Sequence, residues 1–137
     1  MTYQEWLEKV PQCIKEGPVW KSQVYPKALF LFDLTWQDCE KLLRDLRGKV
    51  IAKQLIRSVG SISANLEEGF GRGIGGKQYA YFLQVALGSA REAQGWYYRG
   101  RRLLSPNVVE HRLKLLEEII SLLVSMVRRQ KNLTRNS

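Results

Sequence analysis

Apolar positions recur every three or four residues along most of the chain, a spacing that places side chains on one face of an α-helix. This pattern predicts four long helices within residues 22–131. Residues 1–21 contain Pro11, Gly17 and Pro18, and we expect them to form an N-terminal arm with a short helix over residues 2–10. Residues 132–137 are expected to form a basic C-terminal tail.

The four expected helices differ in how clearly their ends are marked. The first covers residues 22–46 with Gly48 as its stop, and the second covers residues 49–70 and ends in the glycine-rich stretch 71–76. The third follows that stretch, and Ser105 is expected to cap the fourth. The apolar stripes are Ala28, Phe32, Thr35, Cys39, Leu42 and Leu46; Leu55, Val59, Ile62, Leu66 and Phe70; Tyr79, Phe82, Ala86, Ser89, Ala93, Trp96, Gly100 and Leu103; and Leu113, Leu116, Ile120, Leu123 and Val127.

These stripes predict an all-α fold, an antiparallel up-down-up-down four-helix bundle. Short connections favour antiparallel neighbours, and helices of about 22 to 28 residues would be roughly 33 to 42 Å long. Small side chains in the middle of the third helix would let a neighbouring helix approach closely. The fourth helix carries a second apolar row, and Trp36, Tyr97 and Tyr98 add further apolar surface, so we also expect self-association.

Composition and charge narrow the class of protein. A chain of 137 residues with 45% hydrophobic content suits one domain. The net charge of +9 favours an acidic partner such as nucleic acid, and all of it arises after residue 47, where fifteen Lys and Arg face six Asp and Glu. The widely spaced Cys13 and Cys39 and the absence of a signal-like N-terminus predict a reduced, cytoplasmic protein without a disulfide. No apolar run is long enough for a membrane span.

The stretch from Gly71 to Gln78 contains GxGxxG and most of the phosphate-loop pattern GxxxxGK. Both motifs require a preceding β-strand in an α/β unit, whereas this stretch joins two predicted helices. Gln78 also replaces the hydroxyl residue that would bind magnesium. We therefore interpret the stretch as an interhelical loop and expect no nucleotide cofactor there.

No catalytic or metal-binding constellation is evident in the sequence. His111 is the only histidine, and no cysteine or carboxylate cluster lies near it at metal-ligand spacing. A nucleophile, a base and an orienting group cannot be assembled from any motif. We therefore expect His111 to be a surface residue, no cofactor to be bound, and the protein not to be an enzyme.

A polar stripe accompanies the apolar stripe of the second helix, at Ser58, Ser61, Asn65, Glu68 and Arg72. A paired-carboxylate site is one interpretation, but the adjacent Glu67 and Glu68 point about 100° apart on a helix. Interhelical hydrogen bonding or a helix-end ion pair is the favoured alternative, because buried polar groups between helices usually satisfy one another. We expect Asn65 and Glu68 to help join the second and third helices.

Residues 58–72 and 82–93 carry a family resemblance. The pattern Ser-Ile-x-x-Asn-Leu-x-Glu-Gly is followed by Gly-Ser-x-x-Glu, and its fixed positions are Ser61, Ile62, Asn65, Leu66, Glu68 and Gly69, then Gly88, Ser89 and Glu92. Across residues 25–128 the chain resembles the four-helix-bundle family encoded in intervening sequences of bacterial large-subunit ribosomal RNA genes. Within this pattern, Ser61, Asn65, Glu68, Ser89 and Glu92 are the candidate structural polar residues between helices.

The resemblance implies an antiparallel four-helix bundle that assembles as a ring, a homopentamer. It also implies a relationship to the accessory variability determinant of diversity-generating retroelements, a basic pentameric barrel that binds a reverse transcriptase and nucleic acid. Whether this gene lies in a retroelement, a ribosomal RNA intervening sequence or elsewhere is left open by the motif.

Two basic clusters form the candidate nucleic-acid interface. Arginines with an interleaved aromatic residue suit phosphate contact and base stacking, although a solvated helix face is the alternative interpretation. The candidate residues are Arg91, Tyr98, Arg99, Arg101 and Arg102, expected on the third helix, and Arg128, Arg129 and Lys131 with Arg135 near the C-terminus. We expect a non-enzymatic, oligomeric adaptor that binds DNA or RNA, and the family resemblance implies an accessory role to a reverse transcriptase. The alternative is a scaffold whose basic surface docks an acidic protein.

Overall fold

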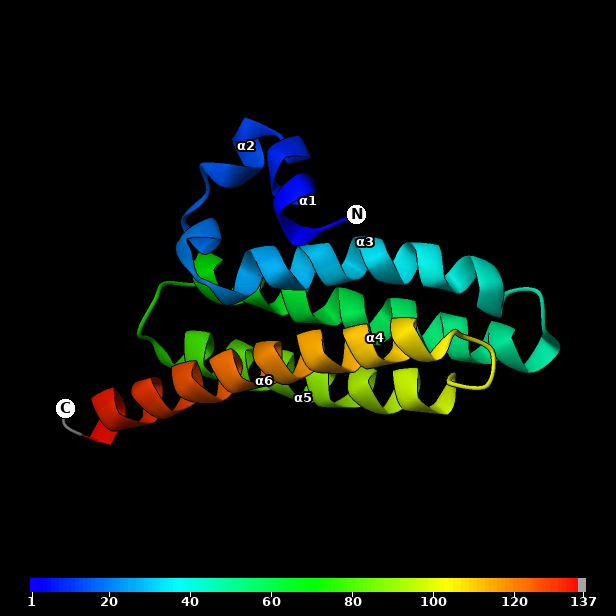
Figure 1. Cartoon of the computed structure of the whole chain (residues 1–137). Helices are drawn as coiled ribbons and strands as arrows, with labels where there is room; N and C mark the ends of the chain where they lie inside the picture. Colours follow the sequence, from blue (N-terminus) through cyan, green and yellow to red (C-terminus); the bar gives the residue numbers. More distant parts are fainter. Residues whose placement is uncertain (136–137) are drawn as a thin grey trace.

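A computed structural model of the chain describes the backbone of residues 1–135 and the side chains of residues 1–133 (Figure 1). Helix is the only regular secondary structure in this part, so the prediction of an all-α protein is confirmed. The helices are α1 (Tyr3–Lys9), α2 (Gln12–Lys15), the 3-10 helix η1 (Pro18–Lys21), α3 (Val24–Leu42), α4 (Leu46–Gly71), α5 (Lys77–Arg99) and α6 (Pro106–Arg135).

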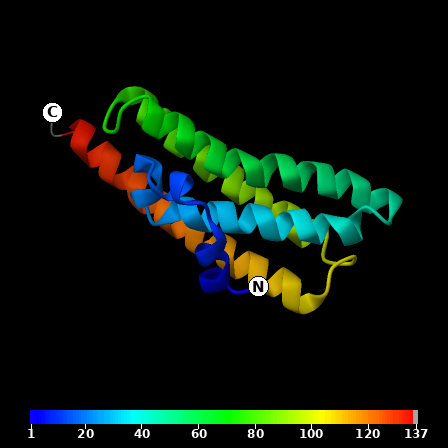
Figure 2. The same cartoon turned by 90° about the horizontal axis from the view of Figure 1, so that it is seen from above.

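The four long helices α3 to α6, here called the bundle, lie side by side along most of their length (Figures 1 and 2). Each packs against the next in the chain, and α3 also packs against α6. Consecutive long helices run in opposite directions in the views, so the α3–α4 and α5–α6 connections share one end of the bundle (Figure 1). The α4–α5 connection and the C-terminal end of α6 lie at the other end.

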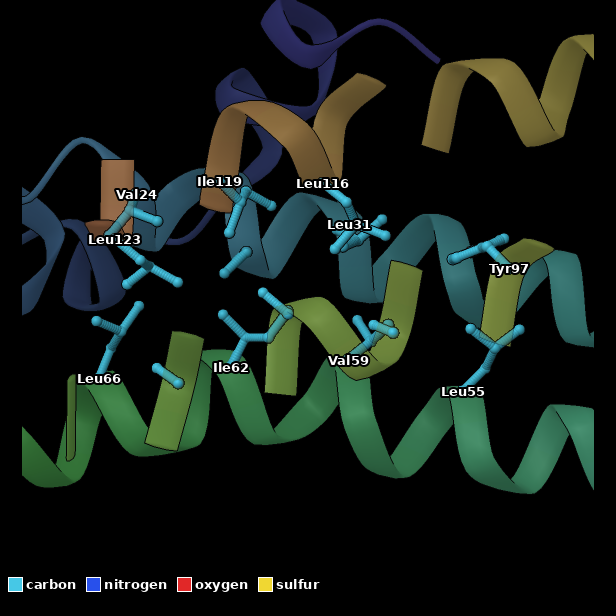
Figure 3. Close-up of a cluster of buried hydrophobic side chains, with 14 of the residues drawn as sticks. Val24, Leu31, Leu55, Val59, Ile62, Leu66, Tyr97, Leu116, Ile119 and Leu123 are labelled. Carbon is cyan, nitrogen blue, oxygen red and sulfur yellow. The ribbon is translucent and has the colours of Figure 1, made fainter. Parts of the chain in front are cut away.

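The core fills the space between all four helices (Figure 3). Leu31 of α3, Ile62 of α4 and Leu116 of α6 are among its fully enclosed side chains. Most predicted stripe positions are buried, because the three-and-four spacing turns them toward a common axis. Leu46 is an exception: it begins α4 rather than continuing α3, and its side chain is 81% exposed.

Helices α4 and α5 share the most extensive contact in the bundle. Ala86, Ala90 and Ala93 of α5 are fully buried there. A Cβ atom added to Gly69 of α4 would lie 3.1 Å from Cβ of Phe82, so the two helices approach closely at that level. The expected role of small side chains in α5 agrees with this packing.

The end of α3 differs from the prediction. The helix ends at Leu42, and Asp45 caps α4 by accepting hydrogen bonds from the backbone N–H groups of Arg47 (2.8 Å) and Gly48 (3.3 Å). Gly48 is therefore not a stop but part of the first turn of α4. A Cβ at this position would lie 2.0 Å from the carbonyl oxygen of Leu42, so the tight corner requires glycine.

The other boundaries are closer to expectation. The Ser105 hydroxyl accepts a hydrogen bond from the Val108 N–H (3.3 Å), which confirms the predicted cap of the fourth helix. The segment after Gly71 is a loop between two helices, with positive φ angles of 101° at Gly73 and 93° at Gly75. Helix α6 continues to residue 135, beyond the predicted boundary at residue 131, and residues 136–137 of the predicted tail lie outside the described part.

The N-terminal arm, residues 1–21, packs beside α3 and builds a second, smaller core. Trp6 of α1 is buried against Phe30 and Leu34, and its indole N–H donates to Oδ2 of Asp33 at 2.7 Å. Thr2 and Glu5 form a capping box at the start of α1. The arm is therefore fixed to the bundle by both apolar contact and a directed hydrogen bond.

The two cysteines are free thiols, Cys13 exposed in the arm and Cys39 buried on α3. Burial raises the pKa of the Cys39 thiol to about 11, so this thiol stays protonated at neutral pH. Among the described helices, none has the length and apolar character that crossing a membrane requires.

Candidate nucleic-acid interface

The first basic cluster, Arg99, Arg101 and Arg102, lies where the chain leaves α5. The helix ends at Arg99. The next residue, Gly100, is buried beside Leu42 and Ile51. Arg101 and Arg102 therefore belong to the turn before α6, and the expectation that they continue the third helix is wrong. The α-helical pattern stops after Gly100, because the Arg101 N–H bonds to the Tyr98 carbonyl three residues back (3.2 Å) rather than four.

Two of these arginines lie over aromatic rings. The Arg101 guanidinium carbon is 4.0 Å from the Tyr98 ring centroid, and its Nη1 donates to the Tyr98 carbonyl at 3.0 Å. The Arg99 guanidinium carbon is 4.6 Å from the Trp96 centroid. Such cation–π contacts restrict the arginine side chains while leaving N–H groups available for an anion. Tyr98 is 56% exposed, but Arg101 already covers one face of its ring.

A groove of about 620 Å³ adjoins this cluster between α5 and α6. Tyr98 and Arg101 form one side, and Val109 and Leu113 of α6 provide apolar surface. Its α6 rim carries both charges, including the exposed pair Lys114–Glu110 at 3.1 Å. The groove therefore combines an apolar floor with a rim of mixed charge.

The second basic cluster, Arg128, Arg129 and Lys131, lies on the last turns of α6. All three side chains are exposed, whereas the Arg135 side chain falls outside the described atoms. Residue 128 is 22 residues after Pro106, which corresponds to about 33 Å along a helix. The clusters thus lie at opposite ends of the bundle, and the structure does not bring them together (Figure 1).

Arg91 is the remaining candidate, exposed near the middle of α5. It precedes Tyr98 by seven residues and so shares its face of the helix. Within the described side chains, no candidate cation of either cluster, nor Arg91, forms an ion pair with a carboxylate. Their charges are therefore available to an external anion.

The candidate polar residues between helices divide into two groups. Ser61 of α4 and Ser89 of α5 share a hydrogen bond of 2.7 Å, and Glu92 accepts one from Arg57 across the same interface. Asn65 donates to the Ser61 carbonyl (2.7 Å) and hydroxyl (2.9 Å), so its contacts reach α5 only through Ser61. Glu68 pairs with Arg72 on its own helix at 3.6 Å.

Glu92 has two donors. The Trp96 indole N–H donates to Glu92 Oε2 at 2.8 Å, and Arg57 binds the same oxygen. The hydrogen bond from Trp96 contributes most to lowering the pKa of Glu92. The hydrogen bond and charge of Arg57 lower it further. Glu92 therefore links α4 to the Trp96 ring under Arg99, which connects the polar interface to the first basic cluster.

A buried polar cluster was missed by the sequence reasoning, which placed Tyr97 among the surface residues that favour self-association, whereas Tyr97 is fully buried. Asp38 of α3 binds Arg112 of α6, and Tyr97 of α5 donates to Asp38 Oδ2 at 2.7 Å. Thr35 completes the cluster through a 2.7 Å hydrogen bond with the Tyr97 hydroxyl. The sequence does contain a sign of this cluster, a charged residue at helical spacing from buried apolar ones. Asp38 is four residues from both Leu34 and Leu42, and Arg112 is three residues after Val109 and four before Leu116.

His111 is exposed, as expected, but it is not isolated. Its Nδ1 accepts a hydrogen bond from Arg112 Nη1 at 2.7 Å. Burial and then the Arg112 charge lower the pKa of His111 below its usual range. No group of three or more potential metal ligands occurs among the described residues.

Comparison with known proteins agrees with this architecture. Residues 21–125 match the model of the 23S rRNA-intervening sequence protein family. A crystal structure of a protein with unknown function from the S23 ribosomal protein family of Bacteroides thetaiotaomicron is 25% identical, with a TM-score of 0.69. The match covers 76% of this chain and 97% of that one, while no curated protein sequence matches. The chain belongs to the 23S rRNA-intervening sequence protein family.

Proposed function

We propose that this protein is a non-enzymatic, oligomeric adaptor that binds DNA or RNA through phosphate contacts. The observation that carries the proposal is the cluster of Arg99, Arg101 and Arg102, which have no carboxylate partner among the described side chains. The net charge of +9 would attract a polyanion to such a cluster. Arginine is well suited to this role because its planar guanidinium can bind phosphate through two N–H groups.

The proposed contact uses the arginine–aromatic stacks. Arg101 over Tyr98 and Arg99 over Trp96 hold their guanidinium groups at the surface, and Arg102 lies in the same turn. Phosphate contacts position a nucleic acid without reading its sequence. We therefore expect low sequence selectivity. A single-stranded base would stack on the free face of Tyr98 or displace Arg101 from the other face.

The second cluster extends the proposed interface. Arg128, Arg129 and Lys131 lie about 33 Å from the first cluster along α6, which is close to the length of one duplex turn. One subunit that uses both ends therefore needs a nucleic acid of at least about 10 base pairs. A shorter ligand would engage one cluster at a time.

Assembly is the second part of the proposal. An antiparallel up-down-up-down bundle that forms a ring, a homopentamer, is the state implied by the family resemblance. Leu46 and Val50 on α4 and Trp36 on α3 support self-association because they are 81%, 61% and 63% exposed. If the gene lies in a retroelement, the protein partner would be its reverse transcriptase.

The test is fluorescence anisotropy with single- and double-stranded DNA and RNA, including ribosomal RNA fragments because of the family name. The variant Arg101→Gln/Arg102→Gln removes two charges from the first cluster. The matched control Lys9→Gln/Lys15→Gln removes the same charge from the N-terminal arm. We expect the first variant to weaken binding to every nucleic acid and the control to change little. Equal effects of the two variants would mean that only net charge matters and would contradict the proposed cluster.

The alternative function is a protein–protein scaffold, and the groove beside Tyr98 favours it. Its apolar floor at Val109 and Leu113 and its mixed-charge rim suit an amphipathic protein segment better than a phosphate backbone. Absence of nucleic-acid binding at low salt would favour this alternative. Leu113→Arg would then be expected to abolish partner binding, whereas under the adaptor proposal it should not weaken nucleic-acid binding, because the added charge is positive.

A further inference from the structure

A second cavity, of about 620 Å³, lies at the end of the bundle that holds the α4–α5 connection. That end of the bundle is on the left in Figure 1. The cavity is bounded by η1 and the start of α3, by the end of α4, by the start of α5 and by the second half of α6. Ile74 of the glycine-rich loop forms part of the wall. That loop is held against α6 because Gln130 Nε2 donates to the Gly75 carbonyl at 2.8 Å.

Two cations face this cavity from different elements, Lys21 of η1 and Arg129 of α6. No carboxylate is among the lining residues, and neither cation forms an ion pair within the described side chains. Glu68 of α4 pairs with Arg72, and Glu67, which accepts a hydrogen bond from the Tyr25 hydroxyl (2.7 Å), is not among the lining residues. The cavity therefore has a positive rim without a compensating internal charge.

The walls of the cavity suit a planar organic group. Phe70 and Tyr79 meet edge to face, with ring centroids 5.4 Å apart, and Met126 supplies a polarizable side chain beside them. Burial raises the pKa of the Tyr79 hydroxyl, and the Arg129 charge acts in the opposite direction, so this hydroxyl lies near the cationic rim. Gln23 and Ser125 add hydrogen-bonding groups to the same lining.

We propose that this cavity binds a nucleotide, with the phosphate at Lys21 and Arg129 and the base against Phe70 and Tyr79. The volume lies in the range of small-molecule sites. A base and a ribose offer hydrogen-bond donors and acceptors to Gln23 and Ser125, which the chain of an alkyl carboxylate would not. A free mononucleotide and the phosphorylated end of a strand present the same chemistry.

This site shares Arg129 with the second basic cluster but is separate from Arg99, Arg101 and Arg102, so its test distinguishes the two proposals. Isothermal titration would use each of the four ribonucleoside monophosphates, adenosine, inorganic phosphate, and a hexanucleotide with either a 5′-phosphate or a 5′-hydroxyl. We expect at least one monophosphate to bind about tenfold or more tightly than adenosine or inorganic phosphate, which carry only the ring or only the charge. We also expect the 5′-phosphorylated strand to bind more tightly than the 5′-hydroxyl strand, which lacks the terminal phosphate. Preference for the strand over the monophosphates would identify a strand end as the source.

Three variants locate the binding. Arg129→Gln removes a rim charge, Met126→Trp fills the cavity, and Lys9→Gln is the control that removes one exposed charge from the N-terminal arm. We expect the first two to weaken nucleotide binding about tenfold or more, with Lys9→Gln nearly unchanged. Circular dichroism shows whether Met126→Trp keeps its helices. Arg129→Gln changes an exposed residue, so it tests nucleotide binding without altering the core.

Two results would overturn the inference. The first is inorganic phosphate binding as tightly as every monophosphate and the 5′-phosphorylated strand, because then only a simple anion is recognised. The second is a binding pattern that does not depend on the rim: no preference for either 5′-phosphorylated ligand class, or a preference that Lys9→Gln removes as much as Arg129→Gln does. In either case, 5′-hydroxyl strands whose binding depends on Arg101 and Arg102 would leave the proposed adaptor function standing.

Discussion

The Arg112 guanidinium of α6 binds the Asp38 carboxylate of α3 through two hydrogen bonds, of 2.7 Å from Nε and 3.0 Å from Nη2. The side chains are only 10% and 7% exposed. Tyr97 donates to the same carboxylate, so one acidic group joins three helices of the bundle. Its burial and the Asp38 charge raise the pKa of the Tyr97 hydroxyl, which therefore remains a proton donor throughout the neutral range.

Loss of one partner in this pair should be costly. Asp38→Ala leaves the Arg112 charge buried without a counter-ion, and we expect a loss of about 3–5 kcal/mol in the free energy of unfolding. The double variant Asp38→Leu/Arg112→Met should lose less, because neither charge remains. Urea denaturation measures both, with Glu110→Gln as an exposed-pair control that should cost less than about 0.5 kcal/mol. A double variant as unstable as Asp38→Ala would contradict this account.

Stability should also depend on pH through His111. Its pKa in the folded protein is lowered from 6.5, first by burial and then by Arg112, so the unfolded chain binds the proton more readily. The stabilisation is complete above about pH 6.5 and is lost as the pH falls through the lower, folded pKa. Urea midpoints at pH 7.5 and 5.5 measure it, and His111→Gln should reduce the difference. An unchanged difference in that variant would assign the pH dependence to other groups.

Two glycines make a matched test of the bundle corner. Gly48→Ala places a Cβ 2.0 Å from the Leu42 carbonyl oxygen, so we expect a loss of about 1–3 kcal/mol in thermal or urea unfolding. Gly88→Ala, on the exposed face of α5 with nothing within 4 Å, should instead stabilise by about 0.4–1 kcal/mol. Equal effects at the two sites would mean that the α3–α4 corner is looser than described.

Features set by neighbouring residues could be predicted from the sequence, whereas features that depend on contacts between distant residues could not. The stripe from Leu55 to Leu66 predicted a buried helix face because its spacing alone determines the face. Gly48 was misassigned because its role is a close approach to Leu42, which no local pattern reveals. Asp38 and Arg112 are 74 residues apart, so nothing in the chain pairs them before the helices pack. Arg101 and Arg102 lie in a turn outside α5, because the helix ends before Gly100.

Self-association should depend on the exposed apolar residues at the start of α4. Leu46→Glu/Val50→Glu places two charges on side chains that are 81% and 61% exposed, so the monomer should lose little stability. We expect light scattering to report a smaller particle than for the unmodified protein, with the same helical signal in circular dichroism. An unchanged particle mass would mean that other residues form the assembly surface. If the unmodified protein is a monomer, the proposed oligomer is contradicted.

The salt dependence of binding tests the central claim most directly. Log affinity for double-stranded DNA or RNA should fall linearly with log salt, because each neutralised phosphate releases condensed counterions. Arg101→Gln/Arg102→Gln should make that slope shallower by up to about 2 per subunit. Lys9→Gln/Lys15→Gln should leave it nearly unchanged. No binding at low salt, or a slope that the Arg101 and Arg102 substitutions do not change, would contradict a nucleic-acid interface at the end of α5.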